Sequence, residues 1–273
     1  MLYAGGAVTE SDRFSRELAC RVFRDYVSRF DSSDPRISLK LEHTFMVAKL
    51  CDEIARSEGL SETDTDLAWL CGLLHDIGRF EQVRRWDTFR DSASIGHAEL
   101  GVEVLGTVEG ARMSDFCDNE EWAGIAMRAV ELHSRLKLPD DLDDRTRMFC
   151  EIVRDADKVD IVRVFSESDS QSVLGLAPDE FRNGSISDAA MAGFEERRCL
   201  GPRDRQANLD GILGVICFSF EIVSPSARSA LDRLGYVDNL LRSPFGLAPS
   251  FASEDTQAKW RKVSRVLGGN VGC

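Results

Sequence analysis

The stretch Leu70-Cys-Gly-Leu-Leu-His-Asp-Ile-Gly-Arg79 decides how this sequence is interpreted. It is an apolar run of helical character that ends in two adjacent polar residues, His75 and Asp76. A buried carboxylate without a partner is destabilising or becomes protonated, so this pair needs a partner inside the fold. A divalent cation would satisfy both side chains, and we therefore expect a metal site enclosed by helices. The chain has four histidines, and the other three flank the pair on both sides: His43, His97 and His133.

The composition is that of a folded protein with a sizeable core. The chain has 273 residues, of which 43% are apolar and 30% are charged. Its net charge of -13 argues against a broad surface for duplex nucleic acid, which needs clustered Lys and Arg. A small phosphorylated substrate needs only a local cationic patch and is compatible with this charge.

The expected location is the cytoplasm. The first residues lack the basic start of a signal peptide, and no apolar run reaches the roughly 18 residues of a membrane span. The longest apolar run, 211–223, is interrupted by Glu221. The eight cysteines are scattered without a C-x-x-C pair, which favours reduced thiols and disfavours a zinc site built from cysteine.

Helical spacing of apolar residues predicts an all-α fold, with no trustworthy β-alternation and no internal repeat. Ser11 and Ser61 are expected N-caps, and Gly78 is expected to end the helix before it in a left-handed conformation. Ser94 is the expected cap of the helix that carries His97, and 79–95 is expected to be a loop or lid. The helices predicted in this part cover 11–30, 38–57, 61–76, a segment from 94, 121–136 and 145–165.

Beyond residue 166 the helical signals are weaker. One or two short helices are expected in 166–205, and longer ones in 210–223 and 226–241. A terminal helix is expected to turn Trp260, Val263 and Val266 inward. We therefore predict a metal-binding helical core in 1–165 and a helical C-terminal extension in 166–273 that packs on the same domain.

The candidate metal ligands follow the order His43, His75-Asp76, His97, His133 and Asp157. This order resembles the HD superfamily of metal-dependent phosphohydrolases, whose signature is His, then His-Asp, then a distant Asp. Three phrases carry the resemblance, which covers about 38–164: His75-Asp-Ile-Gly, His97-Ala-Glu-Leu-Gly-Val-Glu-Val-Leu105 and Asp155-Ala-Asp-Lys-Val-Asp160. It implies an HD-domain helical bundle for this part of the chain, to which the helices predicted beyond residue 166 are additional.

The resemblance also implies roles for individual residues. His43, His75, Asp76 and Asp157 would hold one metal, and His97 and His133 would add a second, with Asp76 bridging the two. Asp155 and Asp160 would be partners of the ligands or surface charges. Imidazole and carboxylate donors suit Mn or Fe, with Ni, Co, Zn or Mg as alternatives, better than Ca.

Two basic side chains near these ligands, Arg79 and Lys158, are candidates for binding phosphate beside the catalytic Asp76. Arg79 lies one turn after His75 and could reach phosphate oxygens, although it could instead pair with Glu81. Lys158 follows Asp157 directly and could neutralise charge, or form a solvated pair with neighbouring carboxylates.

Three functions remain open at this point. The leading hypothesis is a hydrolase of small phosphoesters, possibly nucleotides. The HD-GYP phosphodiesterases fit less well, because Ser-Arg-Leu-Lys-Leu-Pro-Asp follows His133 in place of a second His and Gly-Tyr-Pro. The same ligand set would suit a di-iron oxygenase such as inositol oxygenase. The third function is a metal-stabilised sensor or scaffold whose C-terminal helices bind a partner. The sequence leaves the oligomeric state open.

Overall fold

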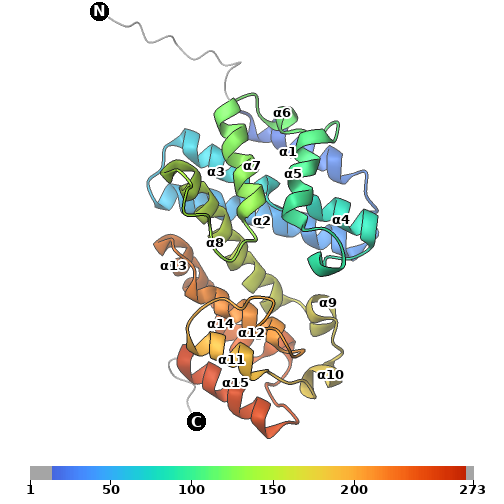
Figure 1. Ribbon diagram of the computed structural model, residues 1–273, viewed down its shortest axis with the longest axis vertical. Coiled ribbons are helices and arrows are strands. Elements are labelled where there is room, and N and C mark those ends of the chain that lie inside the picture. The colour runs from blue at the N-terminus through green and yellow to red at the C-terminus, as the bar shows by residue number, and fades with distance from the viewer. Residues whose placement is uncertain (1–13, 269–273) are drawn as a thin grey trace, which may run out of the picture.

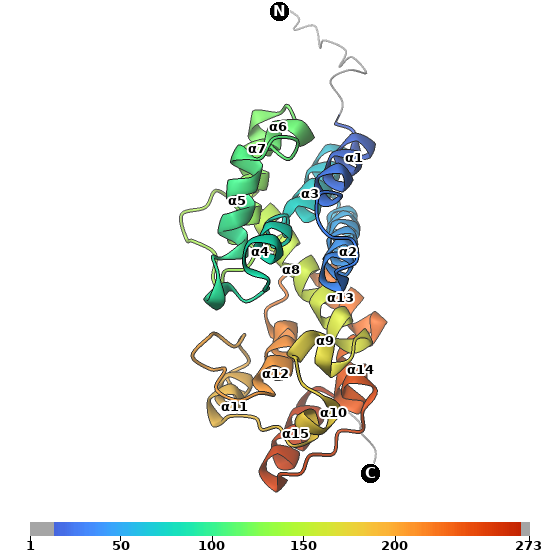
Figure 2. The same ribbon diagram turned by 90° about the vertical axis from the view of Figure 1, so that its right-hand side faces the viewer.

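The computed structural model describes residues 14–268, and within them the chain forms helices and no strand. The all-α prediction is therefore confirmed. Figures 1 and 2 show an elongated molecule in which the long helix α8 runs from one group of helices into a second. The first group and α8 are α1 (Arg16–Val27), α2 (Pro35–Ser57), α3 (Glu62–Leu74), α4 (Gly78–Trp86), η2 (Asp91–Ala93), α5 (His97–Thr107), α6 (Met113–Phe116), α7 (Glu120–Leu132) and α8 (Asp144–Glu167).

Polar side chains at the N-termini explain where several of these helices begin. Ser15, Asp34 and Ser61 each accept a hydrogen bond from a backbone N–H two or three residues later. The predicted cap Ser61 is thus confirmed. The predicted cap Ser11 lies outside the described residues, and α1 is capped by Ser15.

The first group forms two layers around a shared core. In Figure 2, α1, α2 and α3 lie on one side and α5, α6 and α7 on the other, with α4 and α8 between them. Helices α2 and α3 pack so closely that a Cβ on Gly72 would lie 2.8 Å from the Ala48 Cα. Both layers contact α8, which brings its residues near those of α2, α3 and α7.

Gly78 does not end α3 in a left-handed conformation, and that prediction was wrong. Residues 75–77 form a tight turn, and Gly78 is the first residue of α4 with no positive φ. Its role is close packing, because a Cβ at this position would overlap the His97 carbonyl oxygen and the Gly101 nitrogen of α5. A contact with a helix twenty residues later therefore explains the glycine.

The segment 79–95 is not simply a loop or lid, which corrects the second local prediction. It contains α4, whose Phe80 and Val83 are buried, and the short helix η2. Ser94 does not cap α5 either; the N-cap is Gly96, and the Ser94 hydroxyl donates to the Arg90 and Ile95 carbonyls. The apolar face of α4 explains why this polar-looking segment is ordered against the core.

The second group of helices packs around the last turns of α8. Helices α12, α13 and α14 all contact α8. In the terminal helix, Trp260 and Val263 are buried as predicted, but Val266 is 50% exposed and was wrongly expected to face inward. The elements are α9 (Ser170–Leu174), α10 (Pro178–Arg182), α11 (Asp188–Glu195), α12 (Asp210–Cys217), η3 (Phe218–Phe220), α13 (Pro225–Leu234), α14 (Tyr236–Arg242), η4 (Pro244–Gly246) and α15 (Glu254–Leu267).

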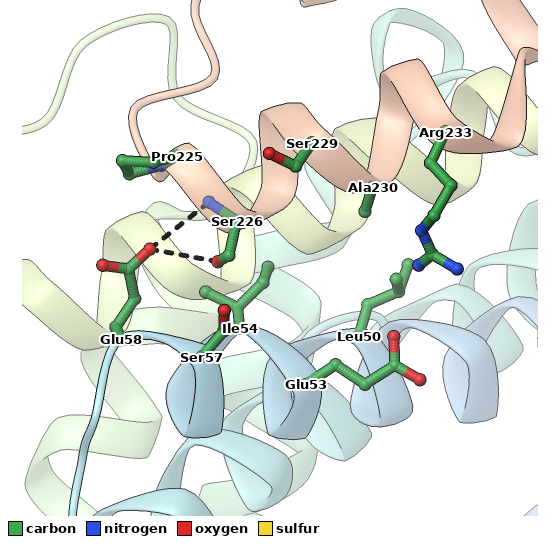
Figure 3. A pocket seen from close by; sticks show the side chains of 10 residues that line it. All are labelled: Leu50, Glu53, Ile54, Ser57, Glu58, Pro225, Ser226, Ser229, Ala230 and Arg233. Carbon is green, nitrogen blue, oxygen red and sulfur yellow. Dashed lines mark hydrogen bonds between the residues drawn. The ribbon is translucent and has the colours of Figure 1, made fainter.

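A groove of about 430 Å³ lies where the two groups meet, between the C-terminal turns of α2 and helix α13. Figure 3 shows that Glu58 reaches across it to Ser226, whose hydroxyl donates to the carboxylate at 3.0 Å. Its lining includes none of the six predicted metal ligands. The groove is therefore separate from the residues that the sequence singles out.

Two further expectations concern the whole chain. Among residues 14–268 no helix is both long enough and apolar enough to cross a membrane. The seven cysteines in this range are free thiols, and Cys273 lies outside the described residues.

Gly78→Ala is expected to lower the free energy of unfolding by about 3 kcal/mol, because the added methyl group meets backbone atoms of α5 that cannot move independently. Gly106→Ala in α5 is the matched control: nothing lies within 4 Å of its added Cβ, and the change should stabilise the helix by roughly 0.5 kcal/mol. Urea unfolding measures both, and equal stability of the Gly78→Ala variant and wild type would contradict the packing argument.

Candidate metal centre

The structure brings the six predicted ligands together from five segments of chain. His43 and Asp157 lie within α2 and α8, and Asp76 lies in the turn after α3. The other three lie at helix ends: His75 follows α3, His97 begins α5 and His133 follows α7. All four histidines and Asp76 are buried, and Asp157 is partly buried.

Three side chains form a first group, composed of His43, His75 and Asp157. The Nε2 atoms of the two histidines lie 3.3 Å apart. Asp157 Oδ1 lies 3.1 Å from the Nε2 of His43 and 3.7 Å from that of His75. Three potential donor atoms, two from α2 and α8 and one from the residue that follows α3, thus lie close together.

A second group is composed of Asp76, His97 and His133. The Nε2 atoms of its two histidines are 3.0 Å apart, and each lies 3.6 Å from Asp76 Oδ1. The other oxygen, Asp76 Oδ2, lies 3.6 Å from the Nε2 atoms of both His43 and His75. The Asp76 carboxylate therefore stands between the two groups and turns one oxygen toward each.

The other ring nitrogen of every histidine is occupied, which fixes the direction of Nε2. His75 Nδ1 donates to the Gly72 carbonyl and His133 Nδ1 to the Val130 carbonyl, both at 2.7 Å. These carbonyls belong to the last turns of α3 and α7, where helix geometry leaves them without a backbone donor. Because a carbonyl only accepts, Nδ1 carries the proton, and the Nε2 of the neutral ring offers a lone pair.

Carboxylates hold the remaining two rings. Asp160 Oδ2 lies 2.7 Å from His43 Nδ1, and Asp91 Oδ2 lies 2.7 Å from His97 Nδ1. A carboxylate behind a histidine is the usual outer partner of a metal-binding imidazole. Asp160 is thus the partner of a candidate ligand, His43, whereas Asp155 accepts hydrogen bonds from the backbone N–H groups of Val223 and Ser224.

The charge states suit cation binding. Burial lowers the pKa of His75 to about 4 and that of His97 to about 4, so both rings are neutral at pH 7. Burial would raise the pKa of Asp76, but the positive charges of Lys40 and Arg79 help to hold it well below its usual value. Burial also opposes ionisation of Asp157, but in the metal-free protein a proton on His43 Nε2 donates to this carboxylate and lowers its pKa. Burial opposes the charge on His43 too, and the same hydrogen bond helps to raise the pKa of His43. Both carboxylates are therefore ionised, and a cation at the first group would take the place of this proton.

Two buried atoms of this arrangement lack a hydrogen-bond partner among the described residues: Asp76 Oδ1 and Arg79 Nε, which lie 3.5 Å apart as an ion pair. Asp76 Oδ1 also faces imidazole nitrogens that lie 3.0 Å from each other, and two lone pairs at this distance repel. A cation between these nitrogens and Oδ1 would give Oδ1 a partner and relieve the repulsion, so the residues present fit a metal.

The two basic side chains predicted to bind phosphate, Arg79 and Lys158, lie in different surroundings. Arg79 is near the centre: its Nε lies 3.5 Å from Asp76 Oδ1, and its Nη1 donates to the Phe89 carbonyl, Gln82 and Asp91. Lys158 points toward the C-terminal helices, where its Nζ lies 3.4 Å from the Glu221 carbonyl oxygen.

Two residues near the centre were missed in the sequence. Lys40 pairs with Asp76 Oδ2 at 2.6 Å and lies on α2 one turn before His43, a spacing that could have indicated it. Asp91 lies in a connecting segment outside the quoted motifs, and no sequence signal places its carboxylate behind His97.

Comparison with known families agrees with this geometry. Residues 41–162 match the family model described as HD domain. The chain contains an HD domain. No curated protein and no solved structure gave a significant match to the chain. The resemblance drawn from the sequence motifs is confirmed, and the HD domain comprises most of α2, α3 to α7 and most of α8.

The HD domain has a fold of the metal-dependent hydrolase type, and its buried histidine and aspartate groups suit divalent cations. Imidazole nitrogens and carboxylate oxygens together favour first-row transition metals over calcium. In this chain the domain supplies both the donor atoms and the carboxylates that orient them.

Asp160→Asn is expected to lower the affinity for Mn²⁺ by about 10- to 100-fold, because His43 loses the charged partner that orients its ring and raises its basicity. Calorimetric titration of chelator-treated protein measures this. The control is Glu167→Gln, which removes another partner of Arg163, a residue that also binds Asp160. Equal affinities of the two variants would argue against a role for Asp160 in metal binding.

Proposed function

We propose that this protein is a hydrolase of small phosphoesters, either phosphomonoesters or phosphodiesters, that works with two divalent cations. The observation that carries the proposal is the position of Asp76, whose two oxygens each lie 3.6 Å from the Nε2 atoms of a different histidine pair. A carboxylate that faces two imidazole pairs in this way supports the proposal of two cations, one at each pair.

The two groups would hold their cations unequally. His43, His75, Asp157 and Asp76 Oδ2 provide four donor atoms for one cation, whereas His97, His133 and Asp76 Oδ1 provide three for the other. Fewer protein ligands leave more coordination positions for substrate and water. The second position is therefore the better place for the reacting phosphoryl group.

The metal would supply the reactivity, and the chain would supply orientation. When bound, such cations lower the pKa of a coordinated water from 15.7 to about 7 and neutralise charge on a phosphoryl group. Arg79 lies beside Asp76 with its guanidinium fixed by Gln82, Asp91 and the Phe89 carbonyl. It can therefore bind a phosphate oxygen with little loss of side-chain entropy.

Protein purified without chelators is expected to contain about two metal ions per chain. His97→Ala removes one donor of the three-donor group and should leave about one ion, with the other retained by His43, His75 and Asp157. Elemental analysis measures the ratio. A wild-type ratio near one, or an unchanged ratio in the variant, would contradict the binuclear assignment.

The protein loaded with Mn²⁺ or Fe²⁺ is expected to release phosphate or a phosphomonoester from members of a broad phosphoester panel. Asp76→Asn should reduce release to background, because both groups lose their shared charged ligand. The reaction should proceed equally with and without oxygen. Turnover that requires oxygen and a di-iron centre would instead indicate the oxygenase, and a complete lack of turnover would favour the sensor or scaffold.

A further inference from the structure

Lys40 is the charged neighbour of the metal centre that the proposed mechanism has not used. Its Nζ lies 2.6 Å from Asp76 Oδ2, in an ion pair that links the middle of the centre to the first half of α2. The Asp76 side chain is 4% exposed, and that of Lys40 is 17% exposed. Lys40 therefore approaches the buried carboxylate from the solvent side of the centre.

The oxygen that Lys40 holds is the one turned toward His43 and His75. The ammonium group thus provides, in the metal-free protein, positive charge that a cation at the first group would provide. An ammonium group and a divalent cation on the same oxygen repel each other over a few ångströms. Metal binding therefore weakens the ion pair and favours movement of Lys40 away from Asp76.

The aromatic ring of Phe89 lies beside both basic side chains that surround Asp76. Lys40 Nζ lies 5.7 Å from the centre of this ring, and the Arg79 guanidinium carbon also lies 5.7 Å from it. The two cations thus share one aromatic neighbour beside Asp76. They differ in freedom, because Nη1 of Arg79 is held by three acceptors, whereas the ion pair of Lys40 is with Asp76.

We propose that Lys40 exchanges partners when metal binds: it leaves Asp76 Oδ2 and binds a phosphoryl oxygen of the substrate beside Phe89. This assignment rests on the proposed phosphoester hydrolase and adds a substrate-binding residue to it. Lys40 then has two successive roles, as counter-ion of the metal-free centre and as phosphate ligand of the loaded one. An ammonium group suits both, since it is a compact charge on a flexible stem.

Three measurements on a variant without the Lys40 charge distinguish the proposed exchange from a purely structural ion pair: the stability of the metal-free protein, its affinity for metal and its affinity for phosphate. Removing the charge should destabilise the metal-free protein, because the buried Asp76 loses its counter-ion. It should raise the affinity for metal, because a competitor is gone. It should lower the affinity for phosphate, because a ligand is gone. A structural ion pair predicts the first effect without the third.

The test compares Lys40→Met with Lys40→Arg and with Lys49→Met, an exposed lysine of the same helix that pairs with Glu53. Urea unfolding of the metal-free proteins shows whether each variant folds and how stable it is. Calorimetry then measures Mn²⁺ binding, followed by binding of inorganic phosphate to the Mn²⁺-loaded proteins. Lys40→Arg keeps the charge and supplies a folded comparison should Lys40→Met be unstable.

For Lys40→Met we expect Mn²⁺ affinity to rise about tenfold and phosphate affinity to fall about 10- to 100-fold, the range of one charged hydrogen bond. Lys40→Arg should stay within about fivefold of wild type for phosphate, and Lys49→Met should match wild type in all three measurements. Unchanged phosphate affinity, or Mn²⁺ affinity that is unchanged or lower in Lys40→Met, would overturn the exchange. If Lys40→Met does not fold, Lys40→Arg serves as the test, because it keeps the positive charge. Phosphate affinity of Lys40→Arg more than tenfold below that of the wild type would then overturn the exchange as well.

Turnover of the wild type keeps this proposal separate from the one on which it rests. A wild type that releases phosphate from its substrate while Lys40→Met keeps the same KM would refute the assignment of Lys40 alone. A wild type that releases none from any phosphoester would refute the hydrolase, whatever the Mn²⁺ titration shows for Lys40.

Discussion

The ionised carboxylate of Asp76, buried between two pairs of imidazoles, is the constraint on which the rest of this structure depends. A carboxylate in such a place needs positive charge around it, and the chain supplies Lys40 and Arg79 on separate helices. One oxygen still lacks a hydrogen-bond partner among the described residues. The arrangement of α2, α4, α5, α7 and α8 can be understood as the way to place donors around this one group.

Helix ends do much of the positioning. A helix leaves its last carbonyls without backbone donors, and at the ends of α3 and α7 a histidine ring supplies the missing N–H. The same hydrogen bond selects the tautomer and turns Nε2 toward the centre. At His75 and His133 a single hydrogen bond from Nδ1 therefore both caps the helix end and orients Nε2 toward the centre. At His43, in the interior of α2, this role needs a carboxylate from another helix, Asp160.

The sequence predicted the all-α class because helical spacing of apolar residues is visible along the chain. It predicted that the six candidate ligands gather because a buried histidine or aspartate needs a polar partner and these residues follow a recognisable order. It failed where a distant contact overrides a local rule. Gly78 matches the local pattern of a helix terminator, yet its conformation is set by α5. Val266 continues the spacing of Trp260 and Val263 but faces solvent. Asp91 lies in a segment whose path no periodicity describes, so its bond to His97 could be found only in three dimensions.

Helix α8 continues beyond the part of the chain that matches the HD domain and joins it to the C-terminal helices. The family match ends at residue 162, whereas α8 continues to Glu167 and its buried Asp155 is satisfied by the N–H groups of Val223 and Ser224. A fragment cut at the match boundary would strip Asp155 of these donors and expose the side of α8 that α12 to α14 cover. Because Asp157 lies two residues from Asp155, such a cut would loosen the helix beside a candidate metal ligand. In this chain, the smallest piece expected to stand alone is larger than the domain that sequence comparison recognises.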